Sequence, residues 1–81
     1  DPASGRKMEV YTDLPGMQLY GGNYINEGLV GKGGCTYGKR YGVAFETQYF
    51  PNAINIPSFP QPLEKAGETV KTSTVYKFTT V

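Results

Sequence analysis

The chain has 81 residues, a formal net charge of +1, one cysteine and no histidine. Its acidic and basic residues are interspersed, so no basic surface attracts nucleic acid or an anionic membrane, and no apolar run approaches the roughly 18 residues of a membrane-spanning helix. A disulfide within the chain and a histidine-based metal site are also excluded. We expect a cytoplasmic protein that needs no metal or cofactor.

The size of the chain argues against an independent fold. A domain this small buries only about 60% of the surface that its unfolded chain exposes, and it usually relies on disulfides, metals or a partner. The sequence also holds 11 glycines and 6 prolines, and glycine raises the entropy cost of ordering loops. The chain opens at Asp1 without an initiator methionine. We therefore expect residues 1–81 to be a piece of a longer protein that is not stable by itself.

The N-terminal part of the chain alternates with a period of two residues, which is typical of β-strands. The alternation predicts a strand from Lys7 to Thr12 and a short strand over Gln18–Tyr20. Between them, Leu14–Met17 holds proline followed by glycine, the order that favours a type II turn. The glycine-rich stretch Asn26–Gly38 predicts a loop.

The C-terminal part continues the β pattern. Gly42–Gln48 predicts a strand, and Thr69–Thr80 predicts the longest strand of the chain. Four prolines in Phe50–Pro62 exclude a central strand there and predict an ordered or extended connection. Only Leu63–Ala66 has the composition for a helical turn, and Ala66–Glu68 predicts a chain reversal. The predicted fold class is all-β.

Two short motifs resemble nucleotide or nucleic-acid sites but fail in detail. Gly31–Gly34 resembles a phosphate-binding loop, yet it lacks the serine or threonine after the lysine, the upstream glycine spacing and a following helix. Lys39–Phe45 resembles the aromatic strand of RNA-recognition domains, but arginine replaces its glycine, valine and alanine replace an aromatic and a branched residue, Glu46 occupies the final aromatic position, and no helices accompany it. We therefore expect no nucleic-acid partner and an ordinary loop at Gly31–Gly34.

Two further residue types are open to a functional interpretation. The seven tyrosines could stack on sugar rings, although covering a thin β-core while keeping the hydroxyl in water is the commoner role. Cys35 is a poor nucleophile candidate because the chain has no histidine to activate it.

Glu46 is the strongest candidate for acid–base chemistry. It lies in the middle of a predicted strand on one face with Ala44 and Gln48, while Phe45 and Thr47 lie on the other face. A lone glutamate on a strand is usually only solvated, but the aromatic residues that adjoin Glu46 in sequence are expected to crowd it. The residue is a plausible general base, and the usual histidine partner is missing from these residues.

A set of motifs in fixed order extends over nearly the whole chain. Its members are Arg6, Met8, Val10 and Thr12, Pro15–Tyr20, Gly22 and Asn23, Gly31 and Lys32, Tyr37, Phe45–Gln48, Phe50 and Pro51, Asn55, Phe59 and Pro60, Gly67 and Glu68, and Thr74, Tyr76 and Phe78. Together they resemble the C-terminal portion of the galactose mutarotase (aldose 1-epimerase) family. The chain departs from the family pattern at Gly21, Tyr49 and Asn52, and Asn52 is expected to serve a turn.

The resemblance implies a fold and a reaction. The implied fold is the C-terminal part of a large antiparallel β-sandwich, with residues 1–81 forming one segment of a single aldose 1-epimerase domain and the upstream part supplied separately. In that family the glutamate matching Glu46 is the general base, an upstream histidine is the general acid, and the glutamine matching Gln18 contacts the sugar. The implied partner is a free aldose such as galactose or glucose, and the isomerase is active only when assembled with the upstream segment.

Two functional hypotheses remain open at this point. The first is an aldose 1-epimerase that interconverts the α and β anomers of a hexose. The second is a non-catalytic, mutarotase-like β-sandwich with a sugar-binding or regulatory role. The face of Glu46 and the presence of Gln18 are compatible with both hypotheses.

Overall fold

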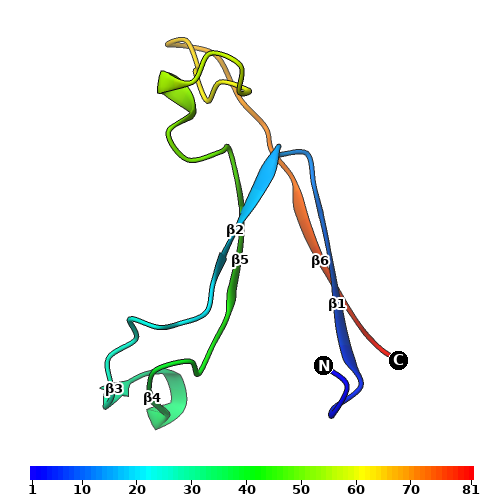
Figure 1. Ribbon diagram of the computed structural model, residues 1–81, viewed down its shortest axis with the longest axis vertical. Helices are drawn as coiled ribbons and strands as arrows, with labels where there is room; N and C mark the ends of the chain where they lie inside the picture. The colour runs from blue at the N-terminus through cyan, green and yellow to red at the C-terminus, as the bar shows by residue number, and fades with distance from the viewer. The chain divides into compact units, whose positions relative to one another are not determined.

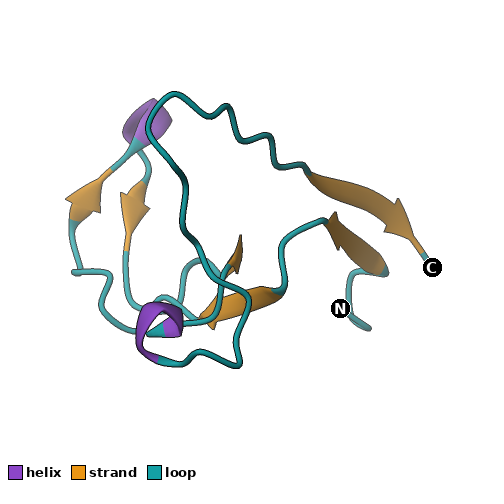
Figure 2. Cartoon of the chain, turned by 90° about the horizontal axis from the view of Figure 1, so that it is seen from above, coloured by secondary structure: helices purple, strands orange, loops and turns teal.

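The structure is a computed structural model that describes residues 1–81, and it is all-β (Figure 1). No α-helix is present, and loops join the short strands through much of the chain (Figure 2). The elements in chain order are the strands β1 (Arg6–Thr12), β2 (Gly16–Tyr20) and β3 (Leu29–Val30), the 3-10 helix η1 (Lys32–Gly34), the strands β4 (Thr36–Tyr37) and β5 (Ala44–Gln48), the 3-10 helix η2 (Ala53–Asn55), and the strand β6 (Thr74–Thr80).

The strands pair as three two-stranded sheets, β1 with β6, β2 with β5, and β3 with β4. The chain divides into two compact units, one made of Asp1–Gly16 with Thr47–Val81 and the other of Met17–Glu46. Ala53, at 3% exposure, is the one apolar side chain in the buried core. The chain therefore has very little buried interior.

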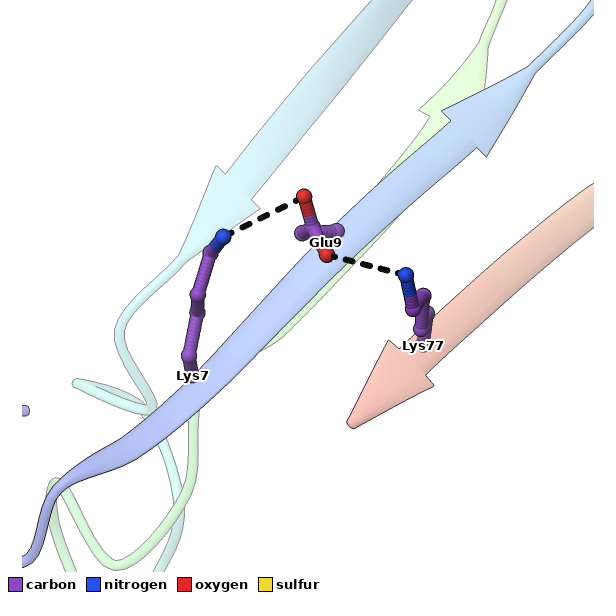
Figure 3. Close-up of polar contacts among 3 residues, drawn as sticks. All are labelled: Lys7, Glu9 and Lys77. Carbon is purple, nitrogen blue, oxygen red and sulfur yellow. Dashed lines mark ion pairs between the residues drawn. The ribbon is translucent and has the colours of Figure 1, made fainter. Parts of the chain in front are cut away.

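The sheet β1–β6 has two unlike faces. The strands are antiparallel with Met8 opposite Phe78 and Glu9 opposite Lys77, and residues directly opposite one another project to the same side. The charged face carries ion pairs from Lys7 Nζ to Glu9 Oε1 at 3.3 Å and from Lys77 Nζ to Glu9 Oε2 at 3.6 Å (Figure 3). The other face is largely apolar, since Val10 lies opposite Tyr76 beside the Met8–Phe78 pair.

The predicted strand over Thr69–Thr80 is too long, because β6 begins only at Thr74. The partner strand β1 ends at Thr12, so residues before Thr74 have no strand beside them. Instead the Ser73 N–H donates to the Asp13 carboxylate at 3.0 Å (Oδ1) and 3.2 Å (Oδ2), and the Asp13 N–H donates to the Ser73 carbonyl at 3.4 Å. This reciprocal contact closes the ladder where the two strands diverge.

The predicted type II turn at Leu14–Met17 is wrong. That turn needs a positive φ at Gly16, whereas Gly16 has no left-handed φ and begins β2. A Cβ on Gly16 would lie 2.6 Å from a carbon of the Phe50 ring. The glycine is therefore required for space beside Phe50 rather than for a turn.

The proline-rich stretch Phe50–Pro62 forms an ordered loop with no strand, as predicted. Gln61 Nε2 lies within donor distance of three carbonyl oxygens, those of Ala53 at 2.8 Å, Phe59 at 2.9 Å and Ile56 at 3.0 Å. The rings of Phe50 and Phe59 meet edge to face with centroids 5.1 Å apart. A single amide therefore holds the loop together from within.

Asn52 serves a turn in this loop, as expected, with a left-handed φ of 61° and its Oδ1 accepting from Asn55 Nδ2 at 2.6 Å. The helical turn predicted at Leu63–Ala66 is wrong, since helical residues occur instead at η1 and η2. The reversal at Ala66–Glu68 is confirmed, with the Glu68 N–H donating to the Lys65 carbonyl at 3.0 Å.

The loop predicted over Asn26–Gly38 contains a small hairpin instead. β3 and β4 pair antiparallel, with Leu29 opposite Tyr37. The N–H groups of Gly31, Gly34 and Cys35 all donate to carbonyls within the hairpin. These donors are consequently not available to cradle a phosphate, and no α-helix follows them.

In the full-length protein, replacing Gln61 by leucine is expected to lower the stability by about 2 kcal/mol, because carbonyl oxygens of the loop lose their donor. Urea unfolding measures the change. Lys65→Gln, a surface substitution close by in sequence, serves as the control and is expected to change stability by less than about 0.5 kcal/mol. Equal stability of the Gln61→Leu variant and the wild type would contradict this account of the loop.

Candidate functional site

The two predicted site residues lie on neighbouring strands of one sheet. Gln18 is on β2 and Glu46 is on β5, and these strands are paired. Both side chains are exposed. The fold therefore brings to one small sheet two polar groups that are far apart in sequence, and it leaves both accessible to a ligand.

Glu46 is the exposed residue of β5, and the other members of the strand are half-buried. The alternation of a strand directs Phe45 and Thr47 to the face opposite Glu46. Glu46 is exposed, so the expectation that its aromatic neighbours in sequence bury its carboxylate is wrong. Both ion pairs of the structure use Glu9, so the Glu46 carboxylate carries no ion pair and its oxygens can accept a proton or a hydrogen bond from a ligand.

Gln18 has one weak contact, from its Nε2 to the carbonyl of Leu19 at 3.3 Å. A side-chain amide has two N–H donors and a carbonyl acceptor with two lone pairs. Gln18 therefore retains donor and acceptor capacity for two different hydroxyl groups of a ligand. It can orient a polyol without changing its own charge.

Two tyrosines next to this sheet have a structural role. The rings of Tyr20 and Tyr24 stack with centroids 6.5 Å apart and an interplanar angle of 9°. The Tyr24 N–H also donates to the Tyr20 hydroxyl oxygen at 2.9 Å. The two rings therefore contact one another and support a local turn, while Tyr24 is 88% exposed and covers no core.

Gly22 connects the chain after β2 to the chain before β5. It is buried with a φ of +72°, and a Cβ there would lie 2.7 Å from the carbonyl oxygen of Gly42. Its own carbonyl accepts from the Arg40 N–H at 3.0 Å, and Arg40 Nε donates to Asn23 Oδ1 at 3.0 Å. Only glycine meets both the left-handed φ and the close approach without strain.

Sequence reasoning missed an open, polar depression of about 370 Å³ beside the β3–β4 hairpin. It includes neither Gln18 nor Glu46. Its lining residues are Glu27, Gly28, Thr36, Tyr37, Gly38, Lys39 and Tyr41. Lys39 and Tyr41 belong to Lys39–Phe45, the stretch that resembles an RNA-recognition strand. In the structure both residues precede β5 and do not lie in a strand. That arrangement removes the remaining likeness to an RNA-binding strand.

No group of three histidine, cysteine, aspartate or glutamate side chains is placed to hold a metal ion, and Cys35 is exposed. None of the helices is long and apolar enough to cross a bilayer. The chemistry that these residues offer is therefore that of one accessible carboxylate and one accessible amide.

The chain is all-β and presents an exposed glutamate and an exposed glutamine on two paired strands, and its relatives define the class of protein. The family model of aldose 1-epimerase matches residues 1–77. The chain belongs to the aldose 1-epimerase family.

Individual relatives agree with this assignment. The chain is 47% identical over 76 residues to the galactose mutarotase of Homo sapiens and 46% identical over 76 residues to that of Mus musculus. It is 34% identical over 74 residues to the aldose 1-epimerase of Escherichia coli. The mammalian alignments cover 94% of this chain but 22% of the relatives, and the bacterial alignment covers 89% and 21%. The chain thus spans about a fifth of the length of the relatives that it matches.

Replacing Gly22 by alanine is expected to cost about 2 kcal/mol, because a Cβ there meets the Gly42 carbonyl and the left-handed φ becomes strained. Thermal unfolding of the full-length protein measures the loss. Gly21→Ala is the matched control, since nothing lies within 4 Å of a Cβ at Gly21. Equal stability of the two variants would show that the contact around Gly22 is not required.

Proposed function

We propose that residues 1–81 form the C-terminal segment of a single aldose 1-epimerase domain, which interconverts the α and β anomers of a free hexose such as galactose or glucose. The observation that carries the proposal is the match to galactose mutarotases over 94% of the chain, combined with an exposed Glu46 next to the strand that carries Gln18. The proposed enzyme works in the cytoplasm on free sugar and needs no cofactor.

The proposed reaction begins at the anomeric hydroxyl. The Glu46 carboxylate accepts the proton of that hydroxyl while an acid protonates the ring oxygen, and the pyranose opens to the aldehyde. Rotation about the C1–C2 bond exposes the other face of the carbonyl, and the two proton transfers then reverse to close the ring as the other anomer. Positioned acids and bases of this kind each contribute about 10²- to 10⁴-fold to the rate.

Histidine is the general acid that the family resemblance implies, and the chain contains no histidine. We assign this role to a histidine in the remaining, upstream part of the domain, so that activity requires assembly of the two parts. Gln18 binds the sugar in this proposal. Its amide donates to one hydroxyl oxygen and accepts from another, which orients the anomeric carbon toward Glu46.

The apolar face of β1–β6 supports the proposal of a larger β-sandwich. Phe78 is 75% exposed in this chain although it lies in the middle of a strand opposite Met8. Antiparallel sheets with one polar and one apolar face ordinarily pack the apolar face on a second layer. The ion pairs of Glu9 lie on the opposite face and need no such cover. The rest of the aldose 1-epimerase domain is the proposed second layer.

In the full-length protein, Glu46→Gln is expected to lower kcat/KM for mutarotation by about 10²- to 10⁴-fold while the fold persists, because the amide cannot accept the proton. Polarimetry of fresh α-D-galactose and α-D-glucose solutions measures the rate, and circular dichroism checks the fold. Glu64→Gln removes another exposed carboxylate and is expected to leave the rate unchanged. A Glu46→Gln variant with a rate close to that of the wild type would overturn the role of Glu46.

Phe78→Ser tests the proposed second layer. In the full-length protein it is expected to cost about 3 kcal/mol, because a buried aromatic side chain is lost. The control is Thr79→Ala on the charged face, which is expected to cost less than about 0.5 kcal/mol. Urea unfolding measures both, and a cost for Phe78→Ser no greater than that of the control would mean that this face stays in water.

A further inference from the structure

Three threonine hydroxyls form a connected chain across strands β1, β6 and β5. Thr47 Oγ1 lies 2.7 Å from Thr74 Oγ1, and Thr74 Oγ1 lies 3.2 Å from Thr12 Oγ1. The Leu14 N–H donates to Thr12 Oγ1 at 3.1 Å. A hydroxyl has one donor hydrogen and two acceptor lone pairs, so each link of the chain can be satisfied at the same time.

The series of threonine hydroxyls begins at the pairing of the two longest strands, β1 and β6. Thr12 and Thr74 are register partners at the end of the β1–β6 ladder, so their side chains project to the same face. Thr47 and Thr74 are half-buried, which strengthens their mutual hydrogen bond relative to one in open water. The hydroxyl of Thr47 is thereby hydrogen-bonded to Thr74, whose position is fixed by the β1–β6 pairing.

Thr47 is also the residue that directly follows Glu46 on β5. Successive residues of a strand project to opposite faces, so a Thr47 side chain held by Thr74 leaves the Glu46 side chain on the opposite, exposed face. Threonine is β-branched and has restricted rotation at χ1. Holding its hydroxyl therefore constrains the rotation of the strand about its own axis, and that rotation sets the direction in which the neighbouring carboxylate projects.

We propose that Thr47, held by Thr74 and Thr12, is a positioning residue for the carboxylate of Glu46. The inference rests on the proposed function, in which Glu46 is the general base. Thr47 has no contact with the sugar in this proposal. Its effect is on the geometry of proton transfer, where a misplacement of about 1 Å can cost about 10²-fold in rate.

The test compares Thr47→Val, which removes the hydroxyl while keeping the β-branched shape, with Thr47→Ser, which keeps the hydroxyl. Thr74→Val and the double variant Thr47→Val/Thr74→Val complete the set. All are made in the full-length protein, and kcat and KM for α-D-galactose are measured by polarimetry. Glu46→Gln is measured in parallel.

The expected result is a fall in kcat of about 10-fold for Thr47→Val at nearly constant KM, with Thr47→Ser recovering most of the rate. Thr74→Val is expected to resemble Thr47→Val, and the double variant is expected to be no worse than either, since the residues act through one hydrogen bond. Unchanged kcat in Thr47→Val, or failure of serine to restore the rate, would overturn the inference.

The Glu46→Gln variant, measured in parallel, separates this inference from the proposed function. If Glu46→Gln is inactive while Thr47→Val keeps the wild-type kcat, Glu46 is the base and the threonine chain does not position it. If Glu46→Gln keeps the wild-type rate, the proposed base is wrong and the inference is overturned with it. A loss of thermal stability in Thr47→Val with kcat unchanged also counts against a positioning role.

Discussion

The antiparallel ladder between β1 and β6 is the constraint on which the order of the first unit depends. It joins the two ends of the chain, from Arg6 opposite Thr80 to Thr12 opposite Thr74. Closing so long a loop costs conformational entropy, although that cost rises only slowly with loop length. Backbone hydrogen bonds and cross-strand side-chain pairs offset it. Because the ladder ends at Thr12 and Thr74, the contact between Asp13 and Ser73 and the threonine chain both begin where it stops.

The β1–β6 sheet is supported by almost no buried hydrophobic core. Ala53 is the single apolar side chain counted as core, and two-stranded sheets are marginally stable in water without a further layer. Order in the proline-rich loop comes instead from the amide of Gln61 and from the contact between Phe50 and Phe59. Local polar contacts of this kind set the conformation of loops, but they do not supply the hydrophobic free energy of a domain. That deficit is consistent with a chain that spans 22% of its mammalian relatives.

Several features of the fold were predictable from the sequence because they depend on local chemistry. Period-two alternation predicted β1 and β5 closely, proline excluded strands from Phe50–Pro62, and Asn52 was expected in a turn. The failures share a different cause. Gly16 was interpreted as a turn residue, yet the ring of Phe50, distant in sequence, determines why glycine is there. β6 was predicted too long because the end of its partner strand is not encoded in its own residues. The hairpin β3–β4 was missed since its strands have two residues each.

The all-β class, the family and the two candidate site residues can be recognised in the linear chain, because strand periodicity and an ordered set of motifs are local properties. The structure adds that Gln18 and Glu46 lie on paired strands, that Glu46 is exposed, and that Thr47 contacts Thr74. These features could not be predicted, because strand pairing and side-chain contacts depend on residues far apart in sequence. Local preference does not encode those distant partners.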